Sequence, residues 1–274
     1  MNDTGNLAWM ITASALVLLM TPGLAFFYGG LVRAKNIVNT MMFSFISMGL
    51  ATIVWVLWGY SLAFSGDGAF IGNLDMFGLN GLDVTDGDAI IFVAFQGMFA
   101  IITPALITGA FAERFKFSTY MVFLVLWLTF VYAPICHWVW ASGGWLFERG
   151  ALDFAGGTVV HINAGIAAVA AAWLLGPRRN ISSGVEPHSV PFVLLGAGML
   201  WFGWFGFNAG SELASDARAT MAFLVTNIAA GTALTVWVIL QYLKTGRFSA
   251  VGAASGAVAG LVAITPASGF VNPL

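Results

Sequence analysis

Eight long apolar runs, separated by short polar connectors, constrain this chain more than any other feature of its sequence. Each run is close to the roughly 20 residues that a helix needs to cross the hydrocarbon core of a bilayer. Only 8% of the 274 residues are charged, whereas a soluble domain carries about 25%. The sequence therefore predicts an all-α fold, a polytopic membrane helix bundle formed by residues 1–274 as one domain. We place the spans at residues 7–32, 38–64, 89–112, 119–140, 157–175, 190–210, 219–243 and 249–267.

The basic residues are divided unequally between the connectors. Only Arg149 and Arg218 lie in even-numbered connectors, and the other eight lie in odd-numbered ones. Because cytoplasmic loops carry an excess of Lys and Arg, this division predicts an N-terminus outside the cell and, after eight crossings, Leu274 outside as well. The eight are Arg33, Lys35, Arg114, Lys116, Arg178, Arg179, Lys244 and Arg247. The acidic residues crowd the connector after the second run, at Asp67, Asp75, Asp83, Asp86 and Asp88.

Some functional classes are disfavoured by composition and by missing motifs. Cys136 is the only cysteine, so the chain has neither an internal disulfide nor a cluster of thiolate metal ligands. A net charge of −2 gives no reason to expect a nucleic-acid partner. Cys136 and His137, with Asp153 and His161, form the one set that resembles a hydrolase or metal site. The sequence has neither His-Glu-x-x-His nor Gly-x-Ser-x-Gly, so we expect no enzyme, no cofactor and no metal.

His161 stands out because it is an ionisable residue inside a span. No charged residue lies between Thr158 and Leu175, and ionisable side chains at that depth usually face a cavity and mark a pathway. The alternative is a core histidine bonded to a neighbouring helix, and this residue alone does not decide between the two. Asp153 lies eight residues earlier, about 12 Å along a helix, so it cannot pair with His161. Its position before two glycines instead predicts a helix cap.

Helix-breaking residues also fall within the spans. Thr21-Pro22-Gly23, Thr103-Pro104 and Thr265-Pro266 are expected to interrupt the first, third and eighth spans. Ile102-Thr103-Pro104-Ala105 recurs as Ile264-Thr265-Pro266-Ala267, five helices later. An odd offset places the copies in opposite orientation, which predicts an inverted repeat of five plus five helices, with a chance match as the alternative. Glycines spaced by four predict a flat face for close packing, at Gly252, Gly256 and Gly260.

Five motifs, in order along essentially the whole chain, resemble those of the ammonium transporter family, the Amt, Mep and Rh proteins. The resemblance implies eleven helices and a second pore histidine on the tenth. The chain would then correspond to the first eight helices, an ammonium-transporter domain incomplete at its C-terminus, with the second half of the repeat truncated. The motifs are Thr21-Pro-Gly-Leu-Ala-Phe-Phe-Tyr-Gly-Gly30, Phe95-Gln-Gly-Met-Phe99, Gly109-Ala-Phe-Ala-Glu-Arg114, Asp153-Phe-Ala-Gly-Gly-Thr-Val-Val-His-Ile-Asn-Ala-Gly165 and Trp204-Phe-Gly-Phe-Asn-Ala-Gly-Ser211.

The resemblance also implies which residues bind the substrate. Phe99, Trp140 and Ser211 match an external recruitment site for ammonium, and Phe99 and Phe207 match stacked rings that gate the pore below it. These residue types suit the task, because aromatic faces attract a cation by about 0.5–2 kcal/mol and a hydroxyl oxygen accepts an N–H bond. The alternative is that these rings only pack against neighbouring helices or lipid.

Asp153 is implied to support the recruitment site, and His161 to line the pore and relay protons. Ammonium would release a proton and cross as ammonia, which potassium cannot do, because a bare cation in an apolar lumen is too costly. The implied partners are ammonium with methylammonium as an analogue, membrane lipid, a homotrimer and a regulatory protein of the PII type on the cytoplasmic face. The implied location is the inner (plasma) membrane. Two alternatives stay open: the ammonium sensor core of a larger signalling protein, and a fragment that does not conduct.

Overall fold

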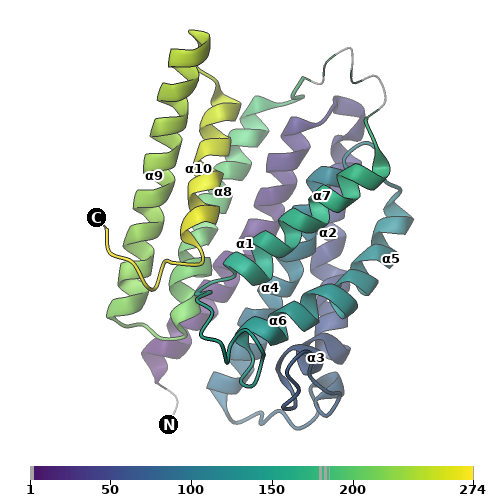
Figure 1. The fold of residues 1–274 in the computed structure, drawn as a ribbon, viewed down its shortest axis with the longest axis vertical. Coiled ribbons are helices and arrows are strands. Elements are labelled where there is room, and N and C mark those ends of the chain that lie inside the picture. Colours follow the sequence, from purple (N-terminus) through teal and green to yellow (C-terminus); the bar gives the residue numbers. More distant parts are fainter. Residues whose placement is uncertain (1–2, 179–180, 182–183, 185, 274) are drawn as a thin grey trace.

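The computed structural model describes residues 3–178, 181, 184 and 186–273, and the regular elements of this part of the chain are all helices (Figure 1). Seven of them are long and apolar enough to cross a membrane. The all-α bundle that the sequence predicts is confirmed. The seven are α1 (Thr4–Leu31), Ala34–Phe64 with α2 (Ile37–Val54) and α3 (Tyr60–Phe64), α4 (Gly87–Phe111), Phe117–Trp140 with α5 (Phe117–Trp127) and α6 (Ala133–Trp140), Gly157–Leu175 with α7 (Asn163–Leu175), Val190–Glu212 with α8 (Val190–Ala209), and α9 (Ala217–Thr245).

The eighth expected span is shorter than the sequence predicts. Helix α10 (Ala250–Ile264) has 15 residues, which corresponds to about 22 Å against a hydrocarbon core of about 30 Å. The helix ends directly before Thr265-Pro266, and turns follow to Phe270. The helix thus begins one residue later and ends three residues earlier than the expected span 249–267, and the prediction that Thr265-Pro266 interrupts this span is confirmed.

The two other proline motifs do not interrupt their helices, so the interruptions predicted for the first and third spans are wrong. Helix α1 continues through Pro22, and α4 continues through Pro104. Both prolines lie in enclosed parts of their helices, where the preceding Thr21 and Thr103 have no exposed surface. A proline costs a helix about 3 kcal/mol, a cost that packing on neighbouring helices offsets here. The two Ile-Thr-Pro-Ala copies thus differ in local structure, and the inverted repeat stays a prediction.

Three of the spans contain a π-helical segment that was not predicted from the sequence. These segments close wider turns than an α-helix and are frequent at functional sites. One of them carries His161. They are η2 (Trp55–Gly59), η4 (Leu128–Tyr132) and η5 (Gly157–Ile162).

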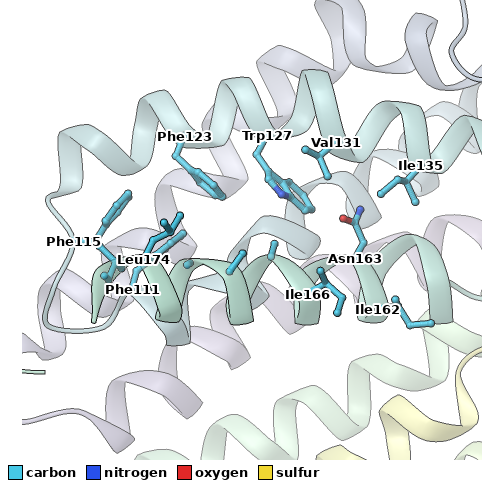
Figure 2. Close-up of a pocket in the computed structure, with 14 residues that line it drawn as sticks. Phe111, Phe115, Phe123, Trp127, Val131, Ile135, Ile162, Asn163, Ile166 and Leu174 are labelled. Atoms are coloured by element: carbon cyan, nitrogen blue, oxygen red, sulfur yellow. The ribbon is translucent and has the colours of Figure 1, made fainter. Parts of the chain in front are cut away.

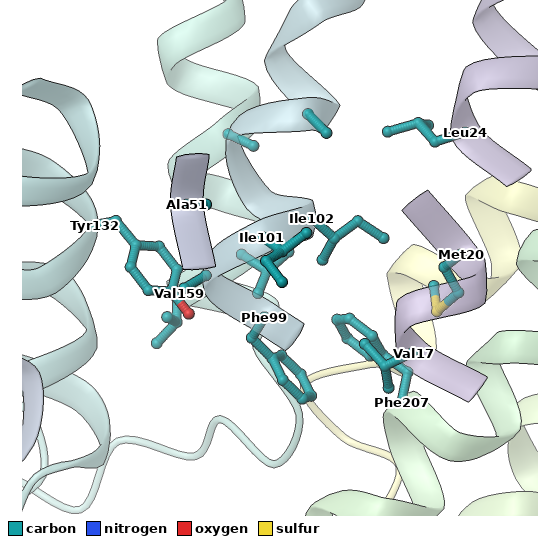
Figure 3. Close-up of a cluster of buried hydrophobic side chains, with 14 of the residues drawn as sticks. Val17, Met20, Leu24, Ala51, Phe99, Ile101, Ile102, Tyr132, Val159 and Phe207 are labelled. Atoms are coloured by element: carbon teal, nitrogen blue, oxygen red, sulfur yellow. The ribbon is translucent and has the colours of Figure 1, made fainter. Parts of the chain in front are cut away.

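The buried core includes residues of α1, α4 and α8, and it contains the two aromatic residues proposed as a gate. Figure 3 shows Phe99 and Phe207 next to each other in this core, beside Val17 and Met20 of α1. Both phenylalanines are fully buried. They therefore do not face lipid. Packing against lipid, one of the alternatives that the sequence left open for these rings, does not apply.

The predicted glycine face of α10 packs against α9, as expected. A Cβ added at Gly256 would lie 2.7 Å from the Trp237 Cβ, and one added at Gly260 would lie 2.4 Å from the Ala229 carbonyl oxygen. Distances this short leave no room for a side chain. Gly252 meets Gln241 of α9 in the same way, so the glycine spacing is explained by helix packing.

The connectors gather at opposite ends of the bundle, as alternating crossings require (Figure 1). At one end, His188 donates its backbone N–H to Val32 and Arg114 donates to the Gly176 carbonyl, which joins the first, third and fifth connectors. At the other end, Trp145 donates its backbone N–H to Ala69, which joins the second and fourth. Of the basic residues that set the orientation, Arg179 lies outside the described residues, as does Leu274.

Candidate functional site

Asp153 begins the helical segment that carries the site. Its Oδ1 accepts the backbone N–H groups of Gly156 and Gly157 at 2.6 and 2.7 Å, and its Oδ2 accepts those of Thr158 and Val159 at 2.7 and 3.1 Å. One carboxylate thus satisfies four N–H groups at a helix start, where the helix dipole also favours a negative charge. The helix-capping contacts that we expected for Asp153 are present.

The glycine pair after Asp153 is explained by conformation and by space. Gly156 has φ +107°, a region that residues with a Cβ rarely adopt. A Cβ at Gly157 would lie 2.3 Å from the Cβ of Pro266, at the end of α10. Thr265, directly before that proline, accepts a hydrogen bond from Trp204 Nε1 at 2.8 Å. The Thr-Pro pair therefore joins the start of η5 to α8, and this role was not predicted.

A continuous line of aromatic contacts leads into the bundle from the end that carries the second and fourth connectors, which we call the outer end after the orientation that the basic residues predict. The ring centroids of Trp140 and Phe99 are 5.7 Å apart, and those of Phe99 and Phe207 are 4.4 Å apart. The Phe207 ring is stacked with His161 at 5.8 Å, and Trp204 lies 5.4 Å from the same imidazole. The structure brings these residues together from α4, α6, η5 and α8, which are far apart in the sequence.

A cavity of about 150 Å³ lies at the outer end of this line. Ser211 lies in its wall and donates its hydroxyl proton to the Phe207 carbonyl oxygen at 2.8 Å, which leaves the lone pairs of its oxygen as acceptors. Trp140 Nε1 donates to the Asp153 backbone carbonyl oxygen at 3.0 Å, so the start of η5 and the indole are held together in the cavity wall. The lining residues are Phe64, Phe92, Gln96, Trp140, Asp153, Phe154, Ser211 and Leu213.

His161 occupies the inner end of the aromatic line. Its Nε2 is buried and has no hydrogen-bond partner among the described residues. The alternative that sequence left open, a histidine bonded to a neighbouring helix, is therefore not supported at this nitrogen. A neutral imidazole offers one donor and one acceptor, so Nε2 is available to a small polar molecule that enters between Trp204 and Phe207.

His137 and Cys136 do not join the site. The His137 ring lies between two backbone carbonyl oxygens, with Nδ1 2.9 Å from Ala63 and Nε2 2.5 Å from Gly68. It fastens the outer connector to α6. Cys136 is buried, and no group of three potential metal ligands occurs in the described part of the chain. The hydrolase or metal alternative gains no support from these contacts.

A larger groove lies elsewhere, between Phe117–Trp140 and α7 (Figure 2). Its volume is about 610 Å³, and Phe123, Trp127 and Val131 face Ile166 across it. Asn163 is its one polar lining residue, and the Asn163 amide donates to the Val159 carbonyl oxygen at 3.1 Å. The groove therefore offers mainly apolar surface, and we assign it no chemistry.

Two features of the site were missed at the level of sequence. Gln96 is the only amide side chain in the third apolar run, a signal that was available. It is 8% exposed and lines the outer cavity. Trp204 stacks on His161; it is the first residue of the motif that ends at Ser211, but no role was assigned to it.

Comparison with known proteins agrees with this geometry. The model of the Ammonium Transporter Family matches residues 8–274. The chain belongs to the ammonium transporter family. An ammonium transporter of Aquifex aeolicus (strain VF5) is 52% identical over 277 residues, which cover 98% of this chain and 65% of that protein. The chain therefore spans about two thirds of the length of this relative.

Solved structures of ammonium transporters have the same fold. The crystal structure of Candida albicans Mep2 matches with a TM-score of 0.93 and 41% identity, over 99% of this chain and 62% of that one. A protein described as a sensor Amt protein matches with a TM-score of 0.91 and 33% identity, over 98% of this chain and 70% of that one. The family's fold thus includes a member named as a sensor as well as transporters.

Proposed function

We propose that this membrane protein transports ammonium: it recruits ammonium at the outer cavity and passes ammonia inward past Phe99 and Phe207 to His161. The observation that carries the proposal is the unbroken series of ring contacts from Trp140 through Phe99 and Phe207 to His161. The function is transport and not catalysis. The names of the relatives support this reading.

The outer cavity has the chemistry to attract ammonium. Trp140 lines it with an aromatic surface, Phe99 lies directly behind with its ring centroid 5.7 Å from that of Trp140, and Ser211 presents a hydroxyl oxygen that accepts N–H bonds. The Asp153 carboxylate adds negative charge behind Trp140. Because the rings of Phe99 and Phe207 fill the path below, a hydrated cation has no room, and ammonium must leave its proton before ammonia passes.

His161 then receives ammonia in a dry environment. Its Nε2 has no partner in the described structure, and an imidazole serves as donor or acceptor according to its tautomer. A proton released at the cavity can be carried separately by imidazole and water. Potassium has no proton to release, so the path discriminates against it even though aromatic faces attract it.

The test is uptake of labelled methylammonium by cells that express the chain, with His161→Ala compared against His188→Ala. His188 lies exposed in the connector before α8, so its replacement removes an imidazole without touching the path. We expect His161→Ala to change uptake or its proton coupling at equal expression, and His188→Ala to behave as wild type. Equal flux and equal currents across pH for both variants would contradict the proposal.

A sensor is the second candidate, favoured by the structural match to a sensor Amt protein. In that case the same cavity binds ammonium and a signalling module responds. Binding without flux distinguishes this candidate: purified protein that binds ammonium calorimetrically, in liposomes that show no protein-dependent alkalinisation, would favour the sensor.

We further propose an inner (plasma) membrane location with the N-terminus outside, a homotrimer, and a PII-type partner on the cytoplasmic face. The basic residues of the odd-numbered connectors support the orientation. Cys136 is fully buried, so introduced cysteines can be labelled selectively. An impermeant maleimide should label Asp67→Cys in intact cells, and Lys35→Cys only after permeabilisation.

A further inference from the structure

We propose that Gln96 is a further ligand of the outer site, and that its amide oxygen accepts an N–H bond from the recruited ammonium ion. The inference rests on the proposed function and names a specificity-determining residue for it. Gln96 is 8% exposed and lines the 150 Å³ cavity together with Ser211 and Trp140.

The amide oxygen of Gln96 needs a partner that the described protein does not supply. Oε1 is buried and has no hydrogen-bond partner among the described residues. Most buried polar atoms in native proteins are paired, and an unpaired acceptor is costly enough to require an explanation. Gln96 lies three residues before Phe99 on α4, so the two side chains share one helix face. Trp140, whose ring packs against Phe99, lines the same cavity as Gln96, so a ligand that contacts the Trp140 indole is close to this amide.

The other polar groups around the cavity decide what kind of ligand fits. The Asp153 carboxylate already accepts four backbone N–H groups, and Trp140 Nε1 already donates to the Asp153 carbonyl oxygen. Ser211 donates its proton to Phe207. The acceptors that remain are the Ser211 oxygen and Gln96 Oε1.

A ligand for this cavity must bring several donors and a positive charge. The cavity repels an anion, because it has two free acceptors, aromatic walls and a nearby carboxylate. A neutral ligand that has only acceptor atoms would find no donor there. Ammonium has four N–H donors, so it can donate to Gln96 and Ser211 while its charge faces the rings. Each methyl group on nitrogen removes one donor. Methylammonium keeps three donors and can still reach both acceptors, whereas trimethylammonium keeps one, so Gln96 favours ammonium and methylammonium over the trimethylated ion.

The experiment replaces Gln96 with Met, which has similar length and no strong acceptor. Gln241→Met is the matched control, because Gln241 Oε1 is also buried without a described partner but lies against Gly252, away from the cavity. The measurements are KM and maximal rate for labelled methylammonium, inhibition of that uptake by ammonium, and the thermal midpoint in detergent. Calorimetric titration with ammonium chloride, against potassium chloride, measures binding directly.

For Gln96→Met we expect KM and the ammonium inhibition constant to rise by on the order of 10-fold, since a hydrogen bond to a charged group is lost. The thermal midpoint should stay equal or rise, because an unpaired buried acceptor is removed. Gln241→Met should leave KM unchanged. A KM within twofold of wild type would overturn the inference, as would a thermal midpoint that falls, since that result means the amide has a partner inside the protein.

The proposed function and this inference fail in different ways. Absence of uptake by wild-type protein defeats the transport proposal, while weaker ammonium binding by Gln96→Met in calorimetry still supports the ligand role. Normal uptake by wild type together with unchanged binding by Gln96→Met defeats the ligand role alone.

Discussion

At the scale of single residues, Asp153 combines a structural and an electrostatic role in one carboxylate. It closes the start of η5 with four hydrogen bonds and lies in the cavity wall beside Trp140. Both roles follow from the same fact: N–H groups at a helix start and a bound cation both prefer a negative oxygen. A change at Asp153 therefore affects helix stability and ion recruitment together, and the two effects have to be measured separately.

Replacing Asp153 with Asn should reduce both stability and transport. One oxygen remains to accept two N–H groups, but the new NH₂ group faces the other two donors and leaves them unpaired. We expect a loss of about 2–4 kcal/mol of stability, because buried unpaired donors cost about 1–3 kcal/mol each. Methylammonium uptake should fall strongly while the protein stays in the membrane.

Asp67→Asn is the matched control, since Asp67 is an exposed aspartate of the outer connector. It removes the same charge without opening a cap, and it should leave uptake and the thermal midpoint close to wild type. Wild-type uptake by a well-folded Asp153→Asn protein would show that the charge is not needed.

His161 and Gln96 show what sequence reveals about individual residues. An imidazole in a run without charges attracts attention at once, because ionisable groups in a span are rare. A single amide does not, because amides also join helices in membrane bundles. What distinguishes Gln96 is the missing partner of Oε1 in a cavity wall, and that depends on neighbours from other helices.

At the scale of helices, run length predicted the spans well and local irregularities poorly. The expected start and end of the third span, residues 89–112, differ by only two residues and one residue from α4 (Gly87–Phe111). Length works because a helix must match the thickness of the bilayer. The uninterrupted helices at Pro22 and Pro104 and the π-helical segments depend on packing between helices, which one sequence does not show.

Gly157, the first residue of the π-helical segment η5, and Gly165 of α7 allow a matched test. A Cβ at Gly157 would lie 2.3 Å from Pro266, whereas a Cβ at Gly165 in α7 would meet no atom within 4 Å. Gly157→Ala should cost about 1–3 kcal/mol through overpacking and lower the thermal midpoint in detergent. Gly165→Ala should stabilise by about 0.5–1 kcal/mol, since alanine favours a helix. Changes of the same sign in both variants would contradict this account of Gly157.

At the scale of the whole molecule, the inner connectors are fastened together by side chains from different parts of the sequence. Glu113 Oε1 accepts the backbone N–H of Arg33 at 3.0 Å, and its Oε2 lies 3.0 Å from Arg33 Nη2. Arg114 donates to the carbonyl of Gly176 beyond α7. These contacts join the ends of α1, α4 and α7. These polar contacts, here called the inner closure, hold the helix ends together where apolar packing between the helices stops.

Acid should weaken this closure. Burial raises the pKa of the Glu113 carboxyl, but the Arg33 backbone N–H, the Asn36 side chain and the charges of Arg33 and Arg178 outweigh it, so the pKa lies below its ordinary value. A depressed pKa means that the contribution to stability is complete above the pKa of the unfolded chain, about 4.3. It is lost as the pH falls through the lower pKa of the folded protein.

Glu113→Gln should therefore be less stable than wild type at pH 7 by about 1–2 kcal/mol, and the difference should shrink as the pH falls below about 4. Gln keeps one oxygen for the Arg33 backbone N–H, so the variant tests the charge more than the shape. Glu148→Gln is the control, because Glu148 is an exposed carboxylate of the outer connector that accepts only the Gly143 N–H, at 3.3 Å. Thermal midpoints in detergent between pH 7 and pH 3.5 give the comparison. A Glu113→Gln deficit that stays constant over this range would mean that the ionised carboxylate does not hold the inner connectors together.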